Sequence, residues 1–219
     1  MPLTIAHRAG NNLAALARAF AAGADYAEAD VWLYRGRLEV RHEKTAGPLP
    51  ILWDRWLLRA MPPPAHRLTL TDLLAVRGEG RLLLDLKGRA EDLAEGLGDV
   101  LKLTKSSEGV AFTGGWDHLD RLAPKFPRAP RFYSLGTPRR LETLRPRFAR
   151  REIAAVSIDS RFLSEAIVSE LRAAAVETII TWAVKSADDA RRVLGWGVDG
   201  ITSDNLALLT ALRNGSPDH

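Results

Sequence analysis

The chain of 219 residues is 46% hydrophobic and 26% charged, contains no cysteine and carries a formal net charge of +4. This length supports one well-packed core rather than two full domains, and the lack of cysteine excludes disulfides, thiolate metal sites and a cysteine nucleophile. The mild basic excess suits an anionic substrate, whereas no helix-turn-helix, zinc-finger or RNA-binding aromatic motif accompanies the basic residues, so we expect no nucleic-acid partner.

Short apolar runs alternate with helical patterns from the first residues onward. A strand is predicted at Leu3–His7, and a helix at Asn12–Ala22 is stopped by Gly23. Tyr26–Leu33 is predicted as the second strand, and a tight turn leads from it to an extended Leu38–His42. The first elements therefore predict a strand, a helix and a hairpin.

The segment Lys44–Arg67 contains Pro48, Pro50 and the run Pro62–Pro64, and we expect it to be irregular. It follows a strand, so in a barrel it would rise over the mouth at the carboxyl ends of the strands. A loop in that place shapes a substrate pocket or simply connects two elements, and the sequence leaves both open.

The second half of the chain continues the alternation. Thr69 begins a helix, with Asp72 placed to return a capping hydrogen bond three residues on. The basic run Arg139–Arg151 has helical spacing and is predicted to be a solvated face, and residues 214–219 are expected to form a flexible tail. Further strands are predicted at Arg81–Leu86, Val110–Thr113, Arg131–Ser134, Ile153–Ile158, Thr178–Trp182 and Gly200–Thr202.

With the hairpin counted as one unit, the pattern gives eight β/α units. Alternating strands and helices predict an α/β fold with a parallel sheet covered by helices, and eight units favour a closed barrel. We therefore expect a single (β/α)₈ TIM barrel over residues 1–219. No signal peptide opens the sequence and no apolar run reaches the roughly 20 residues that span a bilayer, so we expect a cytoplasmic protein without membrane insertion.

Polar side chains gather at the ends of three predicted strands. They are His7 and Arg8, then Glu28 and Asp30 with His42 after the hairpin, then Asp85 and Lys87. Residues i and i+2 of a strand face the same side, so Glu28 and Asp30 should project together, as should Asp85 and Lys87. Each cluster alone is weak evidence, because single histidines and such acidic pairs are common. Their joint placement predicts a functional site.

The three acids Glu28, Asp30 and Asp85 on neighbouring strands would repel one another in a barrel mouth. A divalent cation removes that conflict, and a site made of carboxylate oxygens suits Mg²⁺ or Ca²⁺ better than zinc. Lys87 and Arg8 would add positive charge beside the metal, an arrangement suited to a phosphodiester.

Two histidines stand where a reaction would need proton carriers. His7 and His42 titrate near neutral pH when unperturbed, so one can act as base and the other as acid. The other three histidines, His66, His118 and His219, have no such context and are expected at the surface.

These motifs resemble those of the glycerophosphodiester phosphodiesterase family. The resemblance covers Ile5 to about Leu206 and rests on His7-Arg8-Ala9-Gly10-Asn11, Gly23-Ala24-Asp25-Tyr26-Ala27-Glu28-Ala29-Asp30-Val31, His42-Glu43, Asp85-Leu86-Lys87, Thr181-Trp182-Ala183-Val184-Lys185 and Gly197-Val198-Asp199-Gly200-Ile201-Thr202-Ser203-Asp204. It implies a Mg²⁺- or Ca²⁺-dependent hydrolase that cuts glycerophosphodiesters into glycerol 3-phosphate and an alcohol. By position, it assigns metal binding to Glu28, Asp30 and Asp85, and acid–base catalysis to His7 and His42. It further assigns phosphate binding to Arg8 and Lys87, and a place at the cavity mouth to Trp182.

Three positions depart from the family pattern. Gly10 stands where the family has a glutamate, Glu43 replaces an aspartate, and Asp85 replaces a glutamate metal ligand. The departures motivate two alternatives. One is a lysophospholipase D or sphingomyelinase D-like enzyme that forms a cyclic phosphate, with an apolar channel supplied by Trp53, Trp56 and the 62–64 prolines. The other is a degenerate barrel that binds a phosphorylated ligand without turnover.

Overall fold

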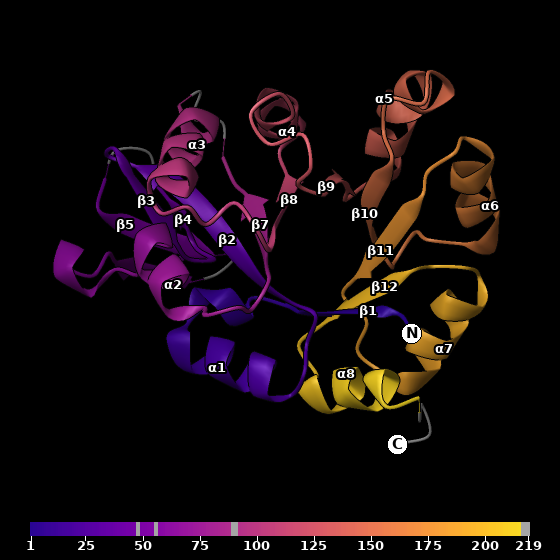
Figure 1. Ribbon diagram of the computed structural model, residues 1–219, viewed down its shortest axis with the longest axis horizontal. Coiled ribbons are helices and arrows are strands. Elements are labelled where there is room, and N and C mark those ends of the chain that lie inside the picture. The colour runs from indigo at the N-terminus through magenta and orange to yellow at the C-terminus, as the bar shows by residue number, and fades with distance from the viewer. Residues whose placement is uncertain (47–48, 55–56, 89–91, 216–219) are drawn as a thin grey trace.

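The computed structural model describes residues 1–46, 49–54, 57–88 and 92–215. Within them, eight parallel strands form a closed ring and a helix follows every strand or hairpin of that ring on its outside (Figure 1). The strands are β1 (Leu3–Ala6), β2 (Tyr26–Tyr34), β7 (Leu82–Leu86), β8 (Val110–Gly114), β9 (Arg131–Leu135), β10 (Ala155–Asp159), β11 (Thr178–Trp182) and β12 (Gly200–Ser203). The helices are α1 (Leu13–Ala21), α2 (Leu70–Val76), α3 (Leu93–Leu103), α4 (Trp116–Leu122), α5 (Pro138–Ala149), α6 (Glu165–Ala173), α7 (Ala187–Gly195) and α8 (Leu206–Arg213). The (β/α)₈ barrel is confirmed.

The ring closes through the first strand. β1 pairs in parallel with β12, where Ile5 lies opposite Thr202, and with β2, where Ala6 lies opposite Ala27. The predicted hairpin is also present, because β3 (Arg37–Val40) runs antiparallel to β2.

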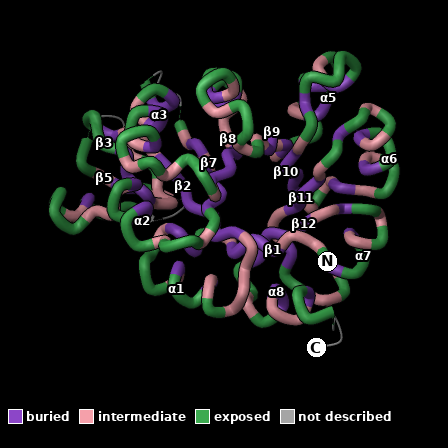
Figure 2. The backbone as a smooth tube through the Cα atoms, in the orientation of Figure 1, coloured by how far each residue is buried: buried purple, intermediate pink, exposed green. Residues whose placement is uncertain are grey.

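Alternation along the strands builds two cores. Outward-facing apolar residues of the strands pack against the helices in one large cluster, and Figure 2 shows this buried layer between the ring and the exposed outer helix faces. A second, smaller cluster packs Ile5, Tyr26, Leu83, Phe132 and Ile180 from different strands together. The second cluster fills the lower part of the ring, so the barrel is a packed core with a floor below its mouth.

Local signals set the helix ends as the sequence predicts. The Thr69 side chain accepts from the Asp72 backbone N–H and the Asp72 carboxylate accepts from Thr69, which makes a complete capping box at α2. Gly23 adopts a φ of 79° just after α1, a conformation that glycine reaches without strain. None of the helices in the described ranges is long and apolar enough to cross a lipid bilayer.

The expectation of an irregular 44–67 segment is wrong. Its described residues form a three-stranded antiparallel sheet of β4 (Lys44–Thr45), β5 (Ile51–Asp54) and β6 (Leu57–Ala60), followed by the short helix η2 (Pro64–His66). Pro50 and the 62–64 prolines lie just outside β5 and β6, so they bound the strands instead of breaking them. Pro48, Trp56 and residues 216–219 lie outside the described residues.

Candidate active site

Directly above the apolar floor, the next inward-facing residues of the strands are polar. They are Glu28, Asp85, Thr113, Ser134, Ser157 and Thr202, and the first five each stand two positions beyond a residue of the floor or one packed against it. They line a cavity of about 350 Å³ at the carboxyl ends of the strands, where barrel enzymes place their active sites.

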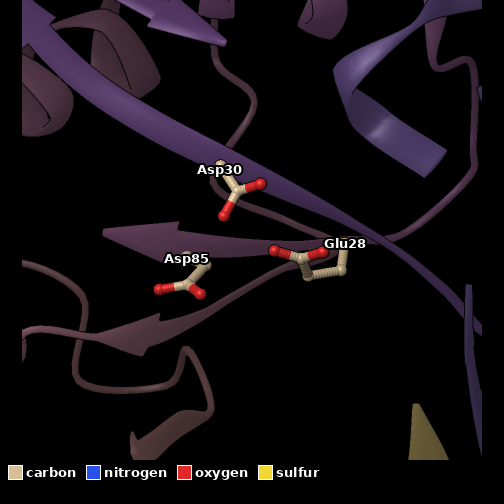
Figure 3. A group of neighbouring side chains, drawn as sticks. All are labelled: Glu28, Asp30 and Asp85. Atoms are coloured by element: carbon tan, nitrogen blue, oxygen red, sulfur yellow. The ribbon is translucent and has the colours of Figure 1, made fainter. Parts of the chain in front are cut away.

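The three predicted metal ligands converge in this cavity. Figure 3 shows the carboxylates of Glu28 and Asp30 from β2 and of Asp85 from β7 pointing toward one another, and one oxygen from each lies within 4.8 Å of the others. Asp30 is directly opposite Asp85 in the strand register. The i, i+2 prediction is confirmed for the geometry of this cluster.

Space for the Asp85 carboxylate depends on Gly114 at the end of the next strand. A Cβ at Gly114 would lie 2.4 Å from Asp85 Oδ1 and 2.5 Å from the Leu86 carbonyl oxygen. Gly114 also has a φ of 106°, which other residues rarely adopt. The glycine thus meets both a conformational and a steric requirement of the acidic cluster.

Hydrogen bonds hold the two β2 acids in place. Glu28 Oε2 accepts from the backbone N–H of Arg8 at 2.6 Å. Asp30 Oδ2 accepts from Asn11 Nδ2 at 2.7 Å, while the Asn11 side-chain oxygen accepts from the Asp30 backbone N–H at 2.8 Å. The turn η1 (Ala9–Asn11) after β1 therefore clamps both acids from one side. Gly10 in that turn packs against Ala29, where a Cβ would lie 2.5 Å from the Ala29 Cβ, so a glutamate does not fit there.

Lys87 balances the acids only in part. Its Nζ lies 2.9 Å from Asp30 Oδ1 and also contacts Asp85. Burial raises the pKa of Glu28 well above its ordinary value, and the charges of Asp30 and Asp85 raise it further. Burial opposes ionisation of Asp30 as well, but hydrogen bonds from His42 and Lys87 outweigh it and hold that pKa well below its usual range.

The donor chemistry of the cluster fits a divalent cation. Three carboxylates face the single ammonium group of Lys87, and the pKa of one of these carboxyls, Glu28, is raised. Hard oxygen ligands of this kind are those that Mg²⁺ and Ca²⁺ take. Glu28, Asp30 and Asp85 are therefore the residues that would hold such an ion.

His7 and Arg8 lie on the rim of the same cavity. Asp204, at the end of β12, approaches His7 Nδ1 with Oδ1 at 2.9 Å and so fixes the ring orientation. Burial lowers the pKa of His7 below 6.5, with a further lowering from Arg8, and Asp204 offsets only part of this. Trp182, at the end of β11, also lines the cavity and lies beside Gly136.

His42 stands at the edge of the site and does not line the cavity. Its Nδ1 is 3.3 Å from Asp30 Oδ2 and its Nε2 is 3.3 Å from Asp54 Oδ2, so a carboxylate faces each ring nitrogen. Asp54 comes from β5, and it is through this contact that the small sheet reaches the barrel mouth.

A second cavity of about 1030 Å³ opens on the other side of His42, between α1, α2 and the small sheet. Its apolar lining includes Leu13, Leu52, Met61, Leu68 and Val76. Trp53, one of the residues expected to supply an apolar channel, lines neither this cavity nor the barrel pocket. The small sheet thus lies beside the barrel mouth and walls a separate, larger cavity.

Two residues expected on the surface are not there. His118 is buried, and its Nε2 lies 3.2 Å from the carbonyl oxygen of Gly88, next to Lys87. Arg140 lies in the basic run predicted as a solvated face, yet it is half-buried and lines the active-site cavity. Predicting these two positions requires knowing which face of α4 and which face of α5 packs against the ring. The sequence alone does not fix the rotation of either helix about its axis. His66 is exposed as expected.

Asp204 and Asn11 are site residues whose roles were not predicted from the sequence. Both stand inside quoted motifs, so the signal was present, but their partners are His7 and Asp30 from other strands. Such contacts become visible only when the barrel is closed.

Neither a scan of protein-family models nor a search of curated proteins finds a match to the sequence. Solved structures do match. A phosphodiesterase of Oleispira antarctica in complex with the product sn-glycerol-3-phosphate has a TM-score of 0.78 at 20% identity, with 97% of each chain covered. Glycerophosphodiester phosphodiesterases of Thermotoga maritima and Parabacteroides distasonis each have a TM-score of 0.73 at 20% identity. These alignments cover 97% of this chain and 99% of the former, and 96% of this chain and 96% of the latter. At such identities the likeness shows a shared fold over the whole chain.

Proposed function

We propose that this chain is a divalent-cation-dependent phosphodiesterase that hydrolyses glycerophosphodiesters to glycerol 3-phosphate and an alcohol. The observation that carries the proposal is the convergence of Glu28, Asp30 and Asp85 within 4.8 Å, with Lys87 beside them, in the mouth of a barrel. Structural neighbours that are glycerophosphodiester phosphodiesterases support the same class, including the phosphodiesterase solved with sn-glycerol-3-phosphate.

The cation, held by the three acids, would supply charge stabilisation of the phosphoryl oxygens, as metal ions do in phosphoryl transfer. Arg8 and Lys87 bind nonbridging oxygens of the phosphodiester and favour the extra negative charge that develops on them during the reaction. Asn11 keeps Asp30 in place for this task.

The two histidines divide the proton transfers. His7 faces the cavity, is held by Asp204 through Nδ1, and has a lowered pKa that keeps it neutral near pH 7, so it takes the proton from the attacking oxygen. His42, whose Nδ1 lies 3.3 Å from the cavity-lining Asp30, gives a proton to the leaving alkoxide from the edge of the site. The attacking oxygen belongs to water or to a neighbouring hydroxyl of the substrate, and phosphorus NMR of the first product separates a monoester from a cyclic phosphate.

The test uses Asp85→Asn and His42→Ala on a panel of glycerophosphodiesters, with and without a chelator. Each variant should lose at least about 100-fold in kcat, because each removes a group that acts on the transition state. Asp188→Asn on α7 is the control, since that exposed acid lies on an outer helix, does not line the cavity and should retain full turnover. Chelator-insensitive, wild-type rates in both site variants would overturn the proposal.

A second candidate function is cleavage of single-chain lysolipids, and one observation favours it. The apolar cavity of about 1030 Å³ adjoins His42 and is large enough for a hydrocarbon chain. Turnover of a long-chain lysolipid above that of its deacylated diester, lost in a Leu52→Lys variant, would select this function. Equal or lower turnover of the lysolipid would reject it.

A further inference from the structure

The walls of the barrel pocket differ in charge. All of the acids lie on the β2–β7 side, together with Lys87, and Arg8 follows β1. From β8 to β12, the described residues that line the pocket are Thr113, Ser134, Ser157, Thr202, Trp182 and glycines, apart from Arg140. Arg140 is thus the charged group on that side of the pocket.

Arg140 is held in place from two directions. Its guanidinium lies over the Trp116 ring, 4.8 Å from the centroid, and its Nη1 donates to the Ser134 carbonyl oxygen at 3.3 Å. The indole N–H of Trp116 donates to the same oxygen at 3.0 Å. Stacking on an aromatic face orients the guanidinium and leaves its other N–H donors for a ligand.

Two arginines further along α5 behave differently. Arg145 pairs with Glu142 and Glu170, and Arg147 pairs with Asp120. Within the described part of the chain, no carboxylate pairs with Arg140. A fixed guanidinium that faces a pocket without an acidic partner is suited to bind an anion from solution.

We propose that Arg140 forms a second anion subsite in this pocket, which favours phosphodiesters whose alcohol carries an additional carboxylate or phosphate. The inference rests on the proposed function and names its substrate class. With the scissile phosphate placed beside Lys87 and Arg8, an alcohol that extends across the cavity reaches Arg140 and Trp182. A quaternary ammonium in that place meets a like charge and is disfavoured.

The test compares two substrates that differ by one carboxylate, glycerophosphoserine and glycerophosphoethanolamine. The wild type should show a KM about tenfold lower for the serine compound, the low end of what a charge-assisted hydrogen bond contributes. Arg140→Gln should bring the ratio of KM values to about one, and Arg140→Lys should keep part of the preference. Arg139→Gln, an exposed neighbour on the same helix, is the matched control and should keep the wild-type ratio.

A second pair, glycerophosphoinositol and its 4-phosphate, separates phosphate from carboxylate as the favoured anion. A preference in either pair that disappears in Arg140→Gln supports the subsite and identifies its ligand. No preference in both pairs, a preference for glycerophosphocholine, or a ratio that Arg140→Gln leaves intact overturns it. If no diester is hydrolysed, the proposed function is wrong. The Kd values of the same pairs, measured by calorimetry, then test the Arg140 subsite independently of turnover.

Discussion

Replacing Gly114 by alanine should damage both stability and cation binding. A residue other than glycine at a φ of 106° carries about 1–3 kcal/mol of backbone strain. The new Cβ would lie 2.4 Å from Asp85 Oδ1 and 2.5 Å from the Leu86 carbonyl oxygen, and overpacking of this kind costs about 1–3 kcal/mol. The sum is about 2–6 kcal/mol, and a middle value of about 4 kcal/mol lowers the Tm of a chain this long by roughly 8–16 °C.

Urea unfolding measures the loss, and calorimetric titration with Mg²⁺ or Ca²⁺ measures the affinity, which should fall about 10- to 100-fold because Asp85 is displaced. Gly36→Ala is the matched control. Gly36 also has a positive φ, 76°, but nothing lies within 4 Å of its added Cβ, so that variant bears strain alone and keeps its cation affinity. Equal midpoints and equal affinities in the two variants would refute the reasoning from the contact with Asp85.

Three further outcomes are expected. Asp204→Asn should lower kcat and move the acid limb of the kcat/KM profile to lower pH, because Asp204 raises the pKa of His7; an unmoved limb contradicts this. Thr69→Ala should cost about 1 kcal/mol in urea unfolding through loss of the α2 cap, and a variant as stable as the wild type would count against the capping role. Burial and acidic neighbours raise the pKa of Glu28, so its stabilising contribution is present at low pH and is lost as pH rises through the folded-state pKa. With chelator at pH 7, Glu28→Gln should therefore unfold at a higher temperature than the wild type, and a lower Tm would show that the buried Glu28 carboxyl does not destabilise the fold.

The barrel could be predicted because its strands are either apolar throughout, being buried on both faces, or show a strict alternation of inward-facing and outward-facing side chains. The run Leu82–Leu86 and the strand Thr178–Trp182 are short, apolar and separated by helical patterns, and the structure places them within a residue or so of the expected bounds. The acidic cluster followed from the same geometry, since i and i+2 share a face in any strand.

The remaining features depend on contacts between distant segments. The small sheet of β4, β5 and β6 was not predicted, because the prolines of this segment indicate a loop, whereas prolines also occur at strand ends. Arg140 and His118 turn inward because α5 and α4 sit on the ring at one rotation, and several rotations were compatible with their sequences. The second nitrogen partner of His42, Asp54, comes from that unexpected sheet.

Closure of the ring by β1 and β12 has a consequence for how the protein is made. His7 and the Asp204 that orients it are separated by 197 residues, and the strands that carry them are the first and the last of the ring. Joining such distant segments is entropically costly and slow, so it comes late in folding. The acidic cluster and Lys87 are therefore synthesised long before Asp204, and the contact between His7 and Asp204 forms only once the final strand has been synthesised and docked.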